Sequence, residues 1–137
     1  MDFALTDDQR AIDESVRRVT ARFGDEYWLA RDRDGAFPHE YRRTVAEGGW
    51  LGIAMPAEHG GNGLGLAEAA VMMHAITDSA GAMSAASAVH LNIFGPMPIV
   101  VAGTGEQKAR FLPPLIAGEE VCCFGVTEPD AGLDTGR

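Results

Sequence analysis

Near the start of the chain, polar and apolar residues follow the period of a helix. Thr6 and Gln9 form a capping-box pattern that predicts a helix start, because each side chain can bond the backbone N–H of the other. Four apolar residues then follow at helical spacing and predict one buried stripe: Ile12, Val16, Val19 and Phe23. Two i,i+4 charge pairs are expected on the solvent side of this helix: Asp13 with Arg17, and Glu14 with Arg18. Gly24 is the expected end of the helix.

The same periodicity predicts more helices further along the chain. Pro38 suits the first turn of a helix that points Tyr41 and Val45 inward and ends at Gly48, whereas residues 25–37 fit a helix or a loop. Helices are also predicted over residues 66–80, 83–94, 98–102 and 104–114. The inward side of the first of these is predicted to hold five apolar residues: Leu66, Ala69, Ala70, Met73 and Ile76.

After residue 118 the pattern changes to that of a buried strand. Residues 121–127 are largely β-branched, aromatic or small and apolar, which predicts a strand. Residues 50–55 are the other strand candidate, and Gly52 makes them a poor one. Because a strand needs ladder partners for its amides, we expect a sheet-forming continuation beyond residue 137. The sequence thus predicts an all-α helical domain over residues 1–118 and the first strand of a β domain over residues 119–137.

Composition narrows the possible functions. The 137 residues carry 20 Asp and Glu against 11 Lys and Arg, a net charge of −9 that disfavours binding to nucleic acid or an anionic membrane surface. The uncharged stretch 83–103 approaches membrane-spanning length, but its polar and proline residues favour short buried helices. The first eight residues lack the features of a signal or transit peptide, so we expect a cytoplasmic protein. Cys122 and Cys123 are adjacent, which suits buried reduced thiols better than a disulfide or a metal site.

Few motifs carry a binding hypothesis. The glycine-rich run 55–65 precedes a helix but has no G-x-G-x-x-G frame and no following Gly-Lys-Ser/Thr, so a structural loop is favoured over a phosphate site. The histidines are scattered and predict no metal site. In residues 126–135, Thr127 ends the predicted strand, Pro129 stops its ladder and Gly132 permits a tight turn. This arrangement suits the polar edge of a ligand, although a plain surface turn is an equally good interpretation.

Separated motifs along the chain together resemble the acyl-CoA dehydrogenase family. The motifs are Gly49-Trp50-Leu51-Gly52 with Pro56, Glu58 and Gly60-Gly61; Thr104-Gly105-Glu106-Gln107-Lys108 with Phe111-Leu112-Pro113; and Phe124 to Asp134, which is similar to the flavin-strand motif T-E-P-x-A-G-S-D. The resemblance covers essentially the whole chain. The resemblance implies an amino-terminal helical domain, a middle β-barrel and a carboxy-terminal four-helix bundle, usually assembled as a homotetramer. This chain would hold the first domain and the opening of a truncated β-barrel.

The resemblance also implies a cofactor, FAD, and a substrate, an acyl-CoA thioester. In the family a glutamate removes the α-proton while a hydride passes from the β-carbon to the flavin, giving a trans-2-enoyl-CoA. That glutamate lies in the carboxy-terminal domain of most members, so no catalytic residue is predicted in this chain and it is expected to be inactive alone. Phe124, Val126 and Thr127 correspond to residues at the pyrimidine edge of the flavin, and Gly132 to the turn beside them. Leu133 replaces a family serine that contacts the flavin or the CoA arm, which leaves the CoA contact at this point open.

Other functions remain compatible with the same residues. Residues 83–94 resemble the helix that flanks the acyl chain, and simple core packing explains any single one of them equally well. Acyl-CoA oxidases, nitroalkane oxidases and flavin monooxygenases share the fold, so fold alone does not choose among them. A non-catalytic helical interaction module is the alternative from another class, and the predicted strand at 121–127 argues against it because a finished module would not end on an unpaired apolar edge. Acyl-chain length, branching and the electron acceptor are not indicated by the sequence.

Overall fold

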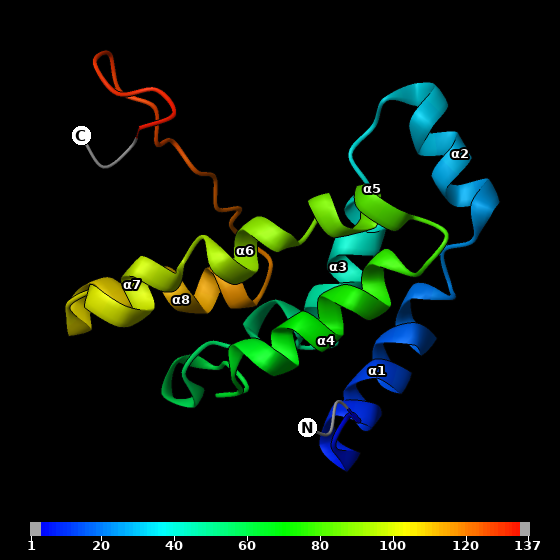
Figure 1. Ribbon diagram of the computed structural model, residues 1–137, viewed down its shortest axis with the longest axis horizontal. Coiled ribbons are helices and arrows are strands. Elements are labelled where there is room, and N and C mark those ends of the chain that lie inside the picture. Colours follow the sequence, from blue (N-terminus) through cyan, green and yellow to red (C-terminus); the bar gives the residue numbers. More distant parts are fainter. Residues whose placement is uncertain (1–3, 135–137) are drawn as a thin grey trace.

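The computed structural model describes residues 4–134, which fold into short helices followed by an extended tail (Figure 1). The helices are α1 Asp7–Thr20, α2 Asp25–Asp34, α3 His39–Glu47, α4 Leu66–Thr77, α5 Ala82–Ser87, α6 His90–Phe94, α7 Met97–Ala102 and α8 Gly105–Ile116, with 3-10 turns η1 Trp50–Gly52 and η2 Ala57–His59. The predicted all-α fold is therefore confirmed for the described residues, and residues 25–37 resolve into a helix and a short connection. Thr135, the last residue of the candidate binding motif, lies outside the described residues.

Helix α1 begins as its capping box predicts. The Gln9 N–H donates to Thr6 Oγ1 at 3.2 Å, and the Thr6 N–H donates to Gln9 Oε1 at 3.1 Å. Ile12 and Val16 are buried, and they belong to one large core shared by α1, α3, α4, α5 and α6. Of the two predicted charge pairs, Asp13–Arg17 forms, whereas Glu14–Arg18 does not, because Arg18 donates to Ser15 instead.

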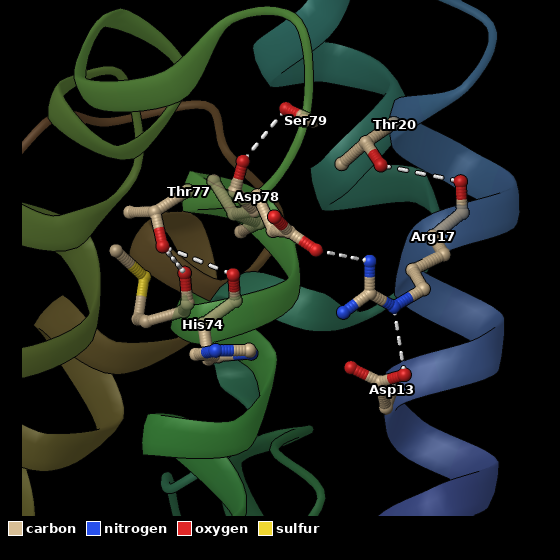
Figure 2. Close-up of polar contacts among 9 residues, drawn as sticks. Asp13, Arg17, Thr20, His74, Thr77, Asp78 and Ser79 are labelled. Atoms are coloured by element: carbon tan, nitrogen blue, oxygen red, sulfur yellow. Dashed lines mark hydrogen bonds and ion pairs between the residues drawn. The ribbon is translucent and has the colours of Figure 1, made fainter.

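A polar clamp fixes α1 against the end of α4 (Figure 2). Arg17 donates from Nε to Asp13 at 2.8 Å and from Nη1 to Asp78 at 2.7 Å. The hydrogen bond from Arg17 holds the pKa of the Asp78 carboxyl below its usual value. At the other end of the same interface, Gln9 donates to Glu68 at 3.1 Å. These links set the rotation of α4 about its axis relative to α1.

The buried face of α4 differs from the predicted one. Leu66 is 69% exposed and Ala70 is exposed, while Met72 is completely buried. The residues that do face inward are Ala69, Met72, Ala75 and Ile76. The prediction is confirmed for Ala69 and Ile76 and wrong for Leu66 and Ala70, because the face of α4 that meets α1 is centred nearer to Met72 and Ala75, between the two polar links at Glu68 and Asp78.

Residues 82–102 are broken into three helices rather than the two that the sequence predicts. By length and composition this stretch is the one helical segment of the described chain that could cross a membrane. Its backbone turns at Val89, where φ is −128°, and again at Gly95, so the predicted helix over 83–94 becomes α5 and α6. Val89 is 1% exposed, which indicates that the turn lets this side chain reach the core while α6 changes direction.

The glycine-rich loop satisfies its own backbone. The N–H groups of residues 61–64 all donate to carbonyl oxygens of residues 52–56, for example from Asn62 to Gly52 at 2.9 Å. Gly61 has no room for a side chain, since a Cβ there would lie 2.2 Å from the Met55 carbonyl oxygen. These amides are therefore unavailable to a phosphate, which agrees with the structural reading of this loop.

Helix α8 ends the helical body on a second, smaller core. Its capping box is formed as predicted, with Gln107 N–H donating to Thr104 Oγ1 at 3.2 Å. The helix runs two residues past Pro114, and it buries Leu112 and Ile116 against Met55. The chain then turns at Gly118 and leaves the helices.

Candidate functional site

The candidate site is the tail that follows α8, residues 119–134, together with the helices that hold its base. Figure 1 shows the tail passing α6 and then running away from the helical body (orange to red). Three side chains hold residues 118–122: Arg42 from α3, Asn92 from α6 and Arg110 from α8. Arg110 forms an exposed ion pair with Glu120 at 3.2 Å, whereas the other two side chains are buried.

Arg42 joins α3 to the start of the tail. Its Nη1 donates to the Gly118 carbonyl at 2.7 Å and its Nη2 to the Glu120 carbonyl at 2.9 Å. Burial lowers the pKa of the Arg42 guanidinium, which is 7% exposed. The two carbonyls replace water molecules that the guanidinium loses on burial. The tail therefore stabilises the buried Arg42, and Arg42 in turn fixes the start of the tail.

Asn92 makes a complete set of hydrogen bonds at the same place. Its Nδ2 donates to the carbonyls of Leu115 at 3.2 Å and Glu120 at 3.0 Å, and its Oδ1 accepts from the Cys122 N–H at 3.0 Å. The residue is 2% exposed. A single buried amide thus links the last turn of α8 to two alternate residues of the tail.

Beyond Cys122 the backbone loses these partners. No N–H group of residues 123–127 finds an acceptor among residues 4–134. The strand predicted over 121–127 is not confirmed, since the part of the chain that the structure describes offers it no ladder partner. Only a narrow turn follows, closed by paired bonds between Glu128 and Ala131.

The predicted flavin residues lie on this tail and are exposed. Phe124 is 54% exposed, Val126 43% and Leu133 fully so, and Thr127 and Gly132 are exposed as well. Of these side chains, Phe124 alone has a ring contact with the helical body, with its centroid 5.9 Å from that of Phe94. The structure therefore brings these residues together by sequence along one segment, and no second element among the described residues completes a pocket around them.

No group of the described residues suggests a metal site at the tail. No cluster of His, Cys, Asp or Glu among residues 4–134 could hold a metal ion. Cys122 and Cys123 are free thiols, as predicted, but the predicted burial is wrong, because Cys122 is half-buried and Cys123 is exposed on the tail. Partial burial raises the pKa of Cys122. A cleft of about 440 Å³ opens elsewhere, between α5 and the connection from α2 to α3, with Trp28 and Ser84 in its lining.

Sequence reasoning missed the two buried residues that hold the tail. Asn92 carried a signal, because it is the one side-chain amide in an uncharged stretch of about twenty residues, and a buried amide requires partners. Arg42 carried none, since it stands beside Arg43 in a charged helix and nothing in the spacing marks it as buried.

Comparison with known proteins gives the family context of this arrangement. Residues 6–119 match the family described as acyl-CoA dehydrogenase, N-terminal domain. Acryloyl-CoA reductase (NADH) from Anaerotignum propionicum is 35% identical over 136 residues, which are 99% of this chain and 34% of that protein.

Two solved structures have the same fold as this chain. Butyryl-CoA dehydrogenase from Megasphaera elsdenii superimposes with a TM-score of 0.82 at 27% identity, over 98% of this chain and 36% of that one. The FAD complex of PigA superimposes with a TM-score of 0.88 at 26% identity, over 98% and 36%. The chain thus spans about a third of the length of these relatives.

Proposed function

The chain belongs to the acyl-CoA dehydrogenase family, and on this premise we propose that it is the amino-terminal part of an FAD-dependent enzyme that oxidises acyl-CoA thioesters to trans-2-enoyl-CoA. The match over residues 6–119 carries the proposal, since it spans every helix of the described chain. Because the chain covers about a third of its relatives, we place the catalytic base outside this sequence. This chain's own contribution is to hold one edge of the flavin and one side of the acyl group.

The tail fits the polar edge of a flavin. Residues 123–127 have N–H groups without acceptors among residues 4–134, and Thr127 adds a hydroxyl that can donate or accept. We propose that Phe124, Val126 and Thr127 meet the pyrimidine edge and that Gly132 forms the turn beside it. When bound, FAD would accept the hydride that leaves the β-carbon of the substrate.

We propose that α5 and α6 flank the acyl group. Met83 is 70% exposed and Phe94 44% exposed, so apolar side chains of these helices are free to contact an acyl chain. Leu133 is fully exposed and has no hydroxyl, so any contact that it makes with the CoA arm is apolar. A reductase of unsaturated acyl-CoA thioesters is the second candidate, because the relative from Anaerotignum propionicum is named acryloyl-CoA reductase (NADH) and the two reactions differ in direction.

The test uses the complete protein, and Thr127→Val is the variant. A hydrogen bond to a ring that gains negative charge on reduction is stronger in the reduced state, so its loss should lower the flavin potential. A charge-assisted bond of about 1–3 kcal/mol predicts FAD binding weakened several-fold or more. Valine preserves shape and strand propensity, so thermal midpoints should change little. Unchanged potential and FAD affinity in a folded variant would show that Thr127 does not contact the flavin.

A second measurement separates the candidate reactions. Mixing the oxidised complete protein with saturated acyl-CoA thioesters under anaerobic conditions should bleach the flavin band near its absorption maximum. A protein that bleaches only with NADH, and then reoxidises with an enoyl-CoA, would be a reductase. Assembly as a homotetramer, a cytoplasmic location and the division of the chain at residues 118 and 119 remain predictions.

A further inference from the structure

Helix α6 contacts the tail at two alternate residues. Asn92 accepts a hydrogen bond from the Cys122 N–H at 3.0 Å, and the Phe94 ring lies 5.9 Å from the Phe124 ring. Residues two apart in an extended chain point to the same side, so Cys122 and Phe124 both face this helix. Phe124 is one of the residues proposed to contact the flavin, and Cys122 is only two residues before it.

The Cys122 side chain lies beside Gly95, a residue at which a Cβ would also meet the Leu91 carbonyl oxygen at 2.3 Å. A Cβ at Gly95, at the end of α6, would lie 2.8 Å from the Cys122 Sγ atom. Real Cβ atoms do not approach a heavy atom so closely, so the tail lies against the helix where a side chain is absent. The tail is therefore seated on α6 at its base, and its direction is set before it leaves the helices.

Asn92 holds the tail against a slip of one residue. Its two N–H donors are taken by the Leu115 and Glu120 carbonyls, and its oxygen is taken by Cys122. A slip of the tail by one residue would leave a buried amide group without a hydrogen-bond partner, which is unfavourable. The same slip would turn Phe124 away from Phe94.

The register at Cys122 determines where Thr127 lies. Thr127 is five positions after Cys122, and an extended chain rises about 3.3 Å per residue. Thr127 therefore lies roughly 16 Å from Cys122. Among residues 4–134, no N–H group of residues 123–127 has an acceptor, and the one ring contact between this segment and the helical body is that of Phe124 with Phe94. A displacement of the backbone at Cys122 should therefore also displace the residues that are proposed to contact the flavin.

We propose that α6 positions the flavin-binding segment through Asn92 and Phe94, so that these two residues tune the flavin although Asn92 does not touch it. The inference rests on the proposed function, because it needs FAD on residues 124–127. Asn92 is a positioning residue that acts through the backbone of Glu120 and Cys122. Phe94 acts through the Phe124 ring.

The experiment uses the complete flavoprotein and compares Asn92→Leu with Asn62→Leu. The chain has two asparagines, and Asn62 is exposed in the glycine-rich loop with no side-chain hydrogen bond to residues 4–134, so it controls for the chemical change. The potential and the absorption spectrum are measured only on molecules that retain FAD, so a general loss of folded protein does not move them. For Asn92→Leu we expect FAD dissociation to increase at least tenfold. We also expect at least a fivefold change in the ratio of oxidised to reduced affinities, which is about 20 mV for a two-electron couple.

Phe94→Leu keeps the test decisive if Asn92→Leu does not fold. Phe94 is 44% exposed, so leucine should be tolerated there, and we expect a shifted flavin spectrum with an unchanged thermal midpoint. A wild-type complete protein without FAD would overturn the proposed function. FAD-loaded wild type, with Asn92→Leu and Phe94→Leu both matching Asn62→Leu in potential, spectrum and affinity, would overturn the inference alone.

Discussion

Tyr41 offers a test of how well the helical core satisfies its polar atoms. Its side chain is completely buried, and its hydroxyl has no hydrogen-bond partner among the described residues. The ring itself is well packed, with centroids 5.3 Å from Phe23 and 5.0 Å from Trp28 in edge-to-face contacts. Tyr41→Phe removes one oxygen and leaves these ring contacts in place.

The expected result is a more stable protein. A buried hydroxyl without a partner costs about 1–3 kcal/mol, so its removal should stabilise the protein. The void left by the missing oxygen offsets part of this stabilisation, and we expect the free energy of unfolding to rise by about 1 kcal/mol. The measurement is urea-induced unfolding of the 137-residue chain at pH 7, followed by far-ultraviolet circular dichroism.

Tyr27→Phe is the matched control, because the chain has two tyrosines and only this hydroxyl is used. The Tyr27 oxygen accepts from the Tyr41 N–H at 3.4 Å, and that amide lies in the first turn of α3, where the helix supplies no acceptor. The same chemical change should therefore lower stability here, by about 1 kcal/mol.

The pH dependence of stability in wild type and Tyr41→Phe gives a second test of the same reasoning. Burial raises the pKa of Tyr41 above its ordinary value of 10.0, because the phenolate would lose its hydration. The pKa of Tyr41 is higher in the folded protein than in the unfolded one. Below pH 10 its ionisation therefore leaves the free energy of unfolding of the wild type unchanged, and above pH 10 that free energy falls as the pH rises. The advantage of Tyr41→Phe should then widen by up to about 1.4 kcal/mol per pH unit. A variant that is less stable than wild type at pH 7, or an advantage that is constant up to pH 11, would refute the reasoning.

Two further predictions concern the clamp and the isolated chain. Asp78→Asn should lower stability at pH 7, and because the folded pKa of Asp78 is depressed by Arg17, the difference should disappear as the pH falls below about 4; a difference that is equal at pH 7 and pH 3 in urea titrations would contradict this. The 137-residue chain alone should be helical, retain little FAD after desalting and reduce no dye with acyl-CoA, so a yellow preparation or sustained dye reduction would show that this chain holds more of the site than we propose. The same chain should self-associate at high concentration through its unpaired tail, which light scattering measures.

Local signals in the sequence were sufficient for the helix starts and for most of the core. The capping boxes at Thr6 and Thr104 form in the structure as predicted, because both partners of each box lie within three residues of one another. Tyr41 and Val45 are buried as predicted, because helical periodicity alone selects their side of α3. These features need no knowledge of what lies across the interface.

The predictions failed where a contact with a residue distant in the sequence determines the local structure. Helix α4 is apolar on several sides, so its period could not say which side meets α1, and the clamp at Asp78 depends on Arg17, 61 residues away. The break at Val89 was hidden because buried positions before and after it keep a helical spacing, from Ala85 through Val89 to Asn92. Arg42 was missed for the same reason, since its two acceptors lie 76 and 78 residues further along the chain.

The backbone changes from satisfied to unsatisfied within the tail, and we propose that this change marks the end of the helical domain. Arg42 and Asn92 occupy the carbonyls of Gly118 and Glu120 and the N–H of Cys122, and from residue 123 onward no N–H up to Thr127 has an acceptor among residues 4–134. A domain that had to stand alone would pair or cover such a segment. The division of the chain at residues 118 and 119 stays a prediction, and it lies within a few residues of this change. If FAD binds residues 124–127 as we propose, the buried amide of Asn92 lies where it can transmit the packing of the helices to the cofactor.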